Sequence, residues 1–187
     1  CFITPAIRRE VLIKMHNELS VDFIDANVMI SAQHTHSAPG GYSEYALYNF
    51  SIPGFQQEVF DSIVSGIFES VNLASLDLKE SNIDFVEGEV DKKMAWNRSL
   101  KAYNQNPENK FVSKENAHKA IDARMRMLRI IQDGEVCAQV NWFGVHATCI
   151  GKDNHHISSD NKGYAAAGFE KKGRKLGIFA QGLSGDV

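Results

Sequence analysis

Apolar positions in the first half of the chain recur every three or four residues, which predicts two helices. The pair Thr4-Pro5 is typical of a helix start, and Ile7, Val11 and Met15 follow at helical spacing up to about Leu19. The clearest amphipathic helix comes later, where one face carries five apolar side chains: Phe60, Ile63, Val64, Ile67 and Val71.

Other apolar segments predict strands. Residues 23–33 are mostly apolar and favour a central strand, and Ile83 alternates with Phe85. The strongest signal is a hairpin in which Asp133-Gly134 joins two apolar strands, with the second running over residues 136–145. A helix capped at Asp160 or Asn161 and a short strand from residue 176 complete the pattern. We expect an α/β fold with mixed α+β character: a large mixed β-sheet flanked by helices, incomplete at both ends.

Composition narrows the class of protein. Hydrophobic residues make up 43% of the chain and charged residues 23%, with a formal net charge of -3, as in an ordinary globular domain. This balance gives no electrostatic argument for nucleic acid, and we expect none as a partner. No uninterrupted run of about 18 apolar residues occurs, so we expect no membrane span. Cys1, Cys137 and Cys149 form neither a disulfide framework nor a CxxC zinc motif, although a bridge between the last two remains an alternative.

Both ends of the chain indicate a piece of a longer protein. The sequence does not start with Met, begins almost directly with a helix, and stops in a Gly-rich turn after a strand. We expect residues 1–187 to be part of a single domain whose remainder lies elsewhere in a longer protein.

Two histidines one residue apart, His34 and His36, follow the apolar segment 23–33. In an extended backbone such residues project to the same side, a geometry that metal sites use. Neutral imidazole is a common zinc ligand, and a catalytic zinc takes about three protein ligands plus an open position for water. Surface or capping histidines at a turn are the alternative.

His146 favours the metal site. It ends a second apolar strand, and ligands from the ends of neighbouring strands converge in space. Arg98 could orient a substrate carbonyl or hydroxyl, although an arginine whose head meets solvent is the alternative. We assign His16, His118, His155 and His156 to the surface, and Ser159-Asp160-Asn161 to a helix cap rather than a nucleophile motif.

Six motifs together carry a resemblance to a known family. They are "HTHSAPGGY", "NRS" followed by "QNP", "DARMRML", "NWFGVH", "SSDNKGYA" and "FAQGLSGDV". In this order they resemble the neutral ceramidases (neutral/alkaline, non-lysosomal), over nearly the whole chain. The chain is similar to the N-terminal catalytic domain of that family, which implies that any C-terminal β-sandwich domain is absent here.

The resemblance implies a site and a reaction. His34 and His146 would be zinc ligands, His36 would lie beside the metal, and Arg98 would position the substrate's polar head or amide. The remaining ligands, a Glu and a Tyr, would come from farther downstream, and the family serine would follow Val187. The cofactor implied is Zn²⁺, and the partner is ceramide or a related N-acyl sphingolipid, with the membrane surface approached only peripherally.

The expected activity is hydrolysis of the N-acyl bond of ceramide to a sphingoid base and a fatty acid, in a protein that is secreted, periplasmic or at the outer cell surface. We expect residues 1–187 alone to be inactive. One alternative is another zinc hydrolase, such as an amidohydrolase barrel, against which the hairpin argues. Another is a non-catalytic lipid-binding relative.

Overall fold

The computed structural model describes residues 1–19, 23–173 and 176–187. Contacts within the chain divide it into two compact units. The first comprises Cys1–Ala32 and Ser37–Glu80, and the second comprises Gln33–His36 and Ser81–Val187.

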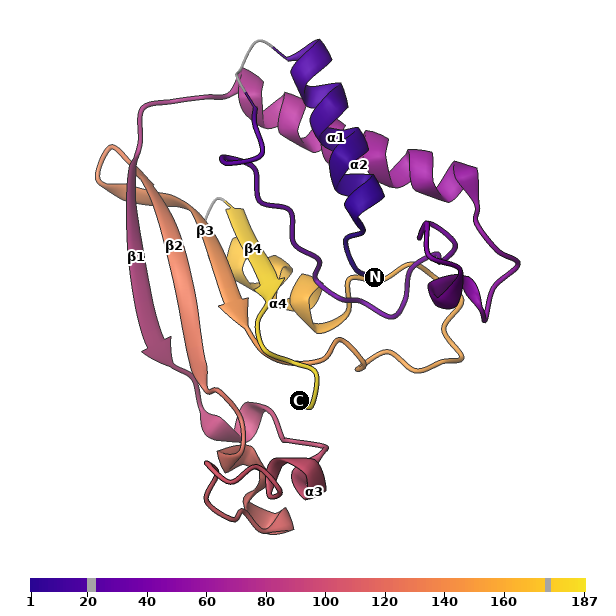
Figure 1. The fold of residues 1–187 in the computed structure, drawn as a ribbon. Coiled ribbons are helices and arrows are strands. Elements are labelled where there is room, and N and C mark those ends of the chain that lie inside the picture. The colour runs from indigo at the N-terminus through magenta and orange to yellow at the C-terminus, as the bar shows by residue number, and fades with distance from the viewer. Residues whose placement is uncertain (20–22, 174–175) are drawn as a thin grey trace. The chain divides into compact units, whose positions relative to one another are not determined.

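The first unit is built on two packed helices, α1 (Pro5–Glu18) and α2 (Gln57–Leu76), with a short 3-10 helix at Ala46–Asn49 (Figure 1). The Thr4 hydroxyl accepts the backbone N–H of Ile7 at 3.2 Å, so the expected N-cap is confirmed. The apolar stripes of both helices meet in one core, as their spacing predicts: Ile7, Val11, Met15, Tyr42, Phe60 and Val64.

Helix α2 is long and apolar enough, by length and composition alone, to cross a membrane, with a mean hydropathy of 1.2. It is the one such helix among the described residues. Phe60 and Val64 on one face are buried in the core with α1, whereas Glu58, Asp61 and Glu69 are exposed on its other sides. This is the pattern of an amphipathic core helix, and we assign α2 to the helix pair.

The strand predicted over residues 23–33 is wrong. Residues 25–27 form a turn, closed by the N–H of Asn27 donating to the carbonyl of Ile24 at 3.1 Å, and residues 28–34 belong to no strand. Phe23, Val28 and Ile30 pack against the helix-pair core instead. The apolar run therefore signals burial, but not pairing with a neighbouring strand.

The second unit contains a four-stranded mixed sheet in the order β1-β2-β3-β4. Its strands are β1 (Asn82–Glu89), β2 (Arg124–Gln132), β3 (Glu135–Phe143) and β4 (Leu176–Gln181), shown side by side in Figure 1. β1, β2 and β3 pair antiparallel, and β4 lies parallel to β3. This topology confirms the mixed α+β class and differs from the all-parallel sheet of an amidohydrolase barrel.

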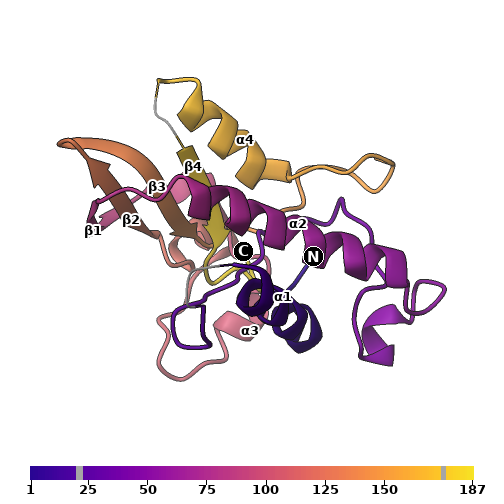
Figure 2. The ribbon, with the colours of Figure 1, turned by 90° about the horizontal axis from the view of Figure 1, so that it is seen from above.

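The predicted hairpin is confirmed, because Asp133 and Gly134 join β2 to β3 with φ values of 51° and 81°. A two-residue turn with both central φ angles positive matches the twist of the strands that it joins. Helix α4 (Asp160–Glu170) packs beside β4, as Figure 2 shows. The polar segment between β1 and β2 forms three short helices: Lys92–Met94, α3 (Leu100–Tyr103) and Lys114–Lys119.

Candidate metal centre

The HTH motif is placed by the residue between its two histidines. Thr35 is buried, its backbone forms an isolated parallel bridge with Ala147, and its hydroxyl donates to the carbonyl of Ser158. Thr35 points inward, and the side chains of His34 and His36 on either side of it converge outside. His34 has a φ of 66°, a left-handed conformation that is uncommon for non-glycine residues and occurs in turns and at functional sites.

The three predicted histidines meet in one cluster. Ring centroids are separated by 5.1 Å for His34–His36, 4.7 Å for His34–His146 and 5.0 Å for His36–His146. One nitrogen from each ring lies within 4.8 Å of the other two, so all three are within reach of one metal ion. The Nε2 atoms of His34 and His36 are 3.4 Å apart, close to the separation of about 3.3 Å for two nitrogens on a tetrahedral zinc.

His146 is fixed by hydrogen bonds to residues from other segments of the chain. Its Nδ1 lies 2.8 Å from the carbonyl oxygen of Ser184, its N–H donates to Val187 at 3.1 Å, and its own carbonyl accepts from Asn161 Nδ2 at 2.9 Å. An imidazole that donates Nδ1–H to a carbonyl presents the Nε2 lone pair outward, which is how metal-binding histidines are usually oriented. The orientation of His146 therefore fits a metal ligand.

Close backbone approach brings the C-terminal segment to His146. A Cβ built on Gly144 would lie 2.0 Å from the carbonyl oxygen of Leu183, so a glycine is required at this position. Next along the chain, the Gln181 side chain accepts the N–H of Val145 at 3.2 Å and donates to its carbonyl at 2.8 Å. "FGVH" and "QGLSGDV" therefore run against each other, which explains why both motifs belong to the site.

Arg98 is placed at the cluster, as predicted. Its Nη2 is 3.1 Å from His146 Nδ1 and 2.9 Å from the carbonyl oxygen of Gly185. The carbonyl of Ser184 already accepts the Nδ1 proton of His146, so the guanidinium donates to Gly185. The charge of Arg98 disfavours protonation of His34 and His36.

Burial is the main cause that lowers the pKa of His34, and the charges of His146 and Arg98 lower it further. The pKa of His36 is also lowered, by burial and then by His146, His34 and Arg98. Both shifts favour neutral imidazoles, the form that binds metals.

The first turn of α4 supports the loop that carries His146. The φ of Asp160 is 53°, and its carboxylate accepts the N–H groups of Cys149 at 3.2 Å and Ile150 at 2.9 Å. Burial raises the pKa of Asp160, but its N–H donors together lower it below the usual value. Helix α4 begins at Asp160 and has Ser159 as N-cap, one residue earlier than predicted, because this carboxylate binds the preceding loop.

Lys162 is a residue of the site region that the sequence did not single out. Its side chain is 3% exposed, and Nζ donates to the carbonyl of Phe143 at 2.6 Å, at the end of β3. Burial lowers its pKa to about 8. Thr35, Gly144, Asn161 and Asn97 were missed as well, since their partners lie far away along the chain; only the glycine in "NWFGVH" offered a local signal.

The other histidines and the cysteines lie outside the cluster. Among the described residues, the only group of three or more His, Cys, Asp or Glu side chains close enough for one metal is His34, His36 and His146. His16, His155 and His156 are exposed, and His118 is half-buried. Cys137 and Cys149 are free thiols, so the alternative of a bridge between them is wrong.

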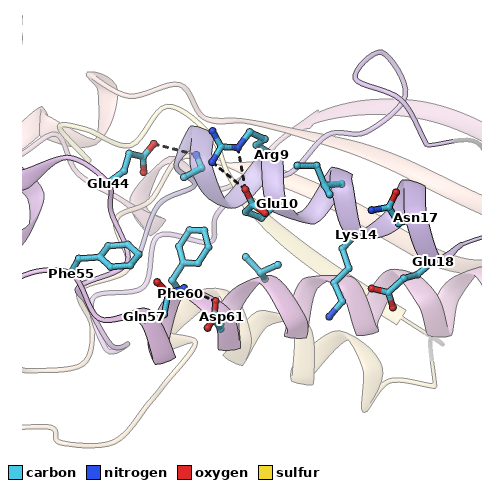
Figure 3. A pocket seen from close by; sticks show the side chains of 13 residues that line it. Arg9, Glu10, Lys14, Asn17, Glu18, Glu44, Phe55, Gln57, Phe60 and Asp61 are labelled. Carbon is cyan, nitrogen blue, oxygen red and sulfur yellow. Dashed lines mark hydrogen bonds and ion pairs between the residues drawn. The ribbon is translucent and has the colours of Figure 1, made fainter.

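The first unit holds a separate groove of about 560 Å³ along α1 and α2, shown in Figure 3. Some of the polar side chains that line this groove pair with one another. Arg9 lies 3.1 Å from Glu10, and Gln57 donates to Asp61 at 2.8 Å. None of the three clustered histidines lines it.

Comparisons with known proteins identify the family of the chain. The sequence model of the neutral/alkaline non-lysosomal ceramidase N-terminal domain matches residues 1–183. The chain belongs to the neutral ceramidase family. It is 36% identical to the neutral ceramidase of Pseudomonas aeruginosa over 99% of this chain and 28% of the relative, and 37% identical to neutral ceramidase B of Dictyostelium discoideum over 88% and 24%.

Solved structures of the family show the same fold. The crystal structure of the Pseudomonas aeruginosa neutral ceramidase superposes with a TM-score of 0.86 at 35% identity, over 99% of this chain and 29% of that one. A structure described as a ceramidase complexed with C2 gives 0.87, also at 35% identity, with the same coverage. This ceramidase-family chain thus spans less than a third of the relatives that it matches.

Proposed function

We propose that the protein to which this chain belongs is a zinc-dependent amidase that hydrolyses the N-acyl bond of ceramide to a sphingoid base and a free fatty acid. The observation that carries the proposal is the convergence of His34, His36 and His146 in a chain of the neutral ceramidase family. Relatives named neutral ceramidases support the substrate class.

The donor set supports zinc as the metal. His34 and His146 would hold it, and by the family resemblance a Glu and a Tyr from farther downstream would complete the site. Imidazole nitrogens suit zinc, and the Nδ1 contact of His146 with Ser184 provides the outer-shell support that such ligands need. Bound zinc supplies an acidified water, with a pKa of about 7, and a Lewis acid for a carbonyl.

The remaining residues act on substrate and water. His36 is exposed at the edge of the cluster, where its imidazole can hydrogen-bond the attacking water or the amide carbonyl. Arg98 is anchored through Nη2 on Gly185, and its planar guanidinium offers further N–H donors to a polar head group or amide. Charge that develops on the amide oxygen during attack would meet donors fixed in advance.

A groove beside Arg98 supports a lipid substrate. It has a volume of about 700 Å³, and Arg98 forms part of its lining together with Trp96, Leu100 and Phe111. Trp96 and Phe111 are largely exposed, which leaves apolar surface for an alkyl chain next to the polar site. The partner would be ceramide or a related N-acyl sphingolipid, drawn from a membrane surface that the enzyme contacts only peripherally. By resemblance, we place the protein outside the cell, in the periplasm or at the outer cell surface.

The test uses the full-length protein. Zinc content and fatty-acid release from N-acylsphingosine are measured for the wild type and for His34→Ala, His146→Ala and the exposed His16→Ala. We expect both properties to be lost in the first two variants and kept in the third. If His34→Ala and His146→Ala kept zinc and activity, the assignment would be wrong, and a wild type that binds zinc without hydrolysis would be a non-catalytic relative. Residues 1–187 alone should bind zinc weakly and turn over no ceramide.

A further inference from the structure

A buried asparagine lies behind the histidine cluster. Asn97 is 3% exposed, and its side chain makes three hydrogen bonds. Its Oδ1 accepts the N–H of Ser99 at 2.7 Å, while Nδ2 donates to the carbonyl of Ala120 at 2.9 Å and to Asp186 Oδ2 at 2.6 Å. Because a backbone N–H can only donate, the Ser99 contact fixes which end of the amide faces Asp186.

The contact with Asp186 ties down a turn that His146 depends on. Residues 184–187 are closed by the N–H of Val187 donating to Ser184 at 3.2 Å, and the backbone N–H of Arg98 holds the carbonyl of Asp186 at 2.7 Å. The same turn supplies the Ser184 carbonyl at 2.8 Å from His146 Nδ1 and the Val187 carbonyl that accepts the N–H of His146. Asn97 is thus adjacent to Arg98 in the sequence, and the 184–187 turn links it to His146.

We propose that Asn97 is a positioning residue of the metal centre, whose amide clamps Asp186 so that the 184–187 turn holds the His146 imidazole with Nδ1 toward Ser184 and Nε2 toward the metal. The inference rests on the proposed function in that the metal is taken to be zinc. Outer-shell contacts of this kind orient the ligand before the metal arrives.

The chemistry of the two side chains separates a clamp from a charge effect. Asn97→Asp has the same shape, but it removes both N–H donors and sets a second carboxylate against Asp186. Asp186→Asn removes the charge but keeps an oxygen that can still accept from Asn97. A clamp therefore fails in the first variant and survives in the second. An electrostatic role of Asp186 on the metal would show the opposite pattern, because its charge is kept in Asn97→Asp and lost in Asp186→Asn.

The experiment measures zinc affinity by chelator competition in the full-length protein, together with kcat/KM for N-acylsphingosine and the thermal midpoint. We expect Asn97→Asp to weaken zinc about 10- to 100-fold, as for other outer-shell changes, and Asp186→Asn to bind zinc as the wild type does. In the double variant the amide introduced at position 186 can donate to the carboxylate introduced at position 97, so most of the zinc affinity should return. If Asn97→Asp does not fold, Asp186→Ala carries the same expected loss.

The matched control is Asn141→Asp, a buried asparagine of β3 that donates to Ile178 at 3.1 Å. It should lower the thermal midpoint and leave zinc affinity unchanged. Wild-type zinc affinity in Asn97→Asp, or a loss that the double variant does not restore and Asn141→Asp reproduces, would overturn the clamp. Absence of ceramide hydrolysis by the wild type would overturn the proposed function instead, and the zinc affinities would still decide the clamp.

Discussion

Different kinds of contact stabilise the interior of each of the two units. In the first unit, α1 and α2 share a core of apolar side chains in which Ile7 and Val11 are fully buried. In the second unit, hydrogen bonds between side chains and backbone groups position the candidate metal centre, where His146 follows the end of β3. His146, for example, forms hydrogen bonds with Ser184, Val187 and Asn161.

The difference concerns what each region can tolerate. Apolar packing is non-directional, so a core accepts changes of shape if volume is conserved and responds mainly in stability. A network of directed contacts responds to the loss of one donor or to a displacement of the backbone, even when volume hardly changes. We therefore expect substitutions in the helix pair to alter the free energy of unfolding and those at the strand ends to alter zinc affinity as well.

The largest effect is expected from Gly144→Ala. The new methyl group would lie 2.0 Å from the carbonyl of Leu183, so the C-terminal segment must move away from His146. We expect a loss of about 4 kcal/mol or more in the free energy of unfolding, the upper end for point substitutions, and loss of zinc. Gly168→Ala in α4 is the control, because its methyl group meets nothing within 4 Å, and it should stabilise the helix by about 0.5–1 kcal/mol. Unchanged zinc affinity in Gly144→Ala would show that the close approach is dispensable.

The next largest effect is expected from Met15→Ala in the helix pair. Met15 is 1% exposed in the core of the first unit, and truncation leaves a cavity. The expected cost is about 2–5 kcal/mol in the free energy of unfolding, with zinc affinity unchanged in the fraction that stays folded. Denaturant unfolding and zinc titration of the full-length protein measure the two quantities. Met15→Leu, which conserves volume, should cost less than about 1.5 kcal/mol. Weakened zinc binding in folded Met15→Ala would remove the distinction between the two regions.

Local patterns predicted those features whose causes are local. Thr4 caps α1, and Asp133-Gly134 takes the turn that its residues favour. The spacing of two residues predicted that His34 and His36 lie on one side. Their orientation depends on Thr35 between them, whose hydroxyl donates to Ser158, 123 residues away along the chain. The bond between Asn97 and Asp186 spans 89 residues. Such pairs depend on the folded topology, and no local period encodes them.

The wrong strand at residues 23–33 has a related cause. An apolar run reports that side chains are buried, whereas a strand also needs a neighbouring backbone to pair with. In this segment the side chains of Val28 and Ile30 pack against the core of the helix pair. The first backbone bridge to another segment is the one between Thr35 and Ala147. The motifs around His34, Arg98 and His146 contribute residues to the candidate site, whereas "DARMRML" lies in and before β2.

A pH-dependent effect of intermediate size is expected from Lys162→Met. Burial lowers the pKa of Lys162 to about 8, from an ordinary value of 10.5. Below pH 8 the folded protein keeps a charged ammonium in a buried site at full cost. Between about pH 8 and 10.5 the folded lysine releases its proton while the unfolded one retains it, so stability rises with pH.

Each unit of pKa shift corresponds to about 1.4 kcal/mol, so the gain amounts to a few kcal/mol at most. Thermal unfolding at pH 7 and pH 9.5 should show the wild type gaining on Lys162→Met. The exposed Lys172→Met serves as the control and should track the wild type. Parallel behaviour of all three proteins would place the Lys162 ammonium in solvent.

The smallest effect is expected from Asp122→Asn, two residues before the start of β2. Its carboxylate accepts from Arg124 Nε at 2.8 Å and from Arg126 Nη1 at 3.3 Å. The hydrogen bond from Arg124 is the main cause that lowers the pKa of Asp122 to about 2, although burial opposes it. A depressed pKa stabilises the fold above the ordinary value of 3.8 and ceases to do so as the pH falls through about 2.

Since the ion pair lies near the surface, Asp122→Asn should cost about 1 kcal/mol at pH 7. The difference from the wild type should shrink below about pH 4, and zinc affinity at pH 7 should not change. Thermal midpoints from pH 7 to pH 3 measure this, with the exposed Asp153→Asn as the control. A difference that stayed constant down to pH 3 would mean that the side chain acts by shape and not by charge. A change in zinc affinity would extend the directed network of the metal centre as far as the start of β2.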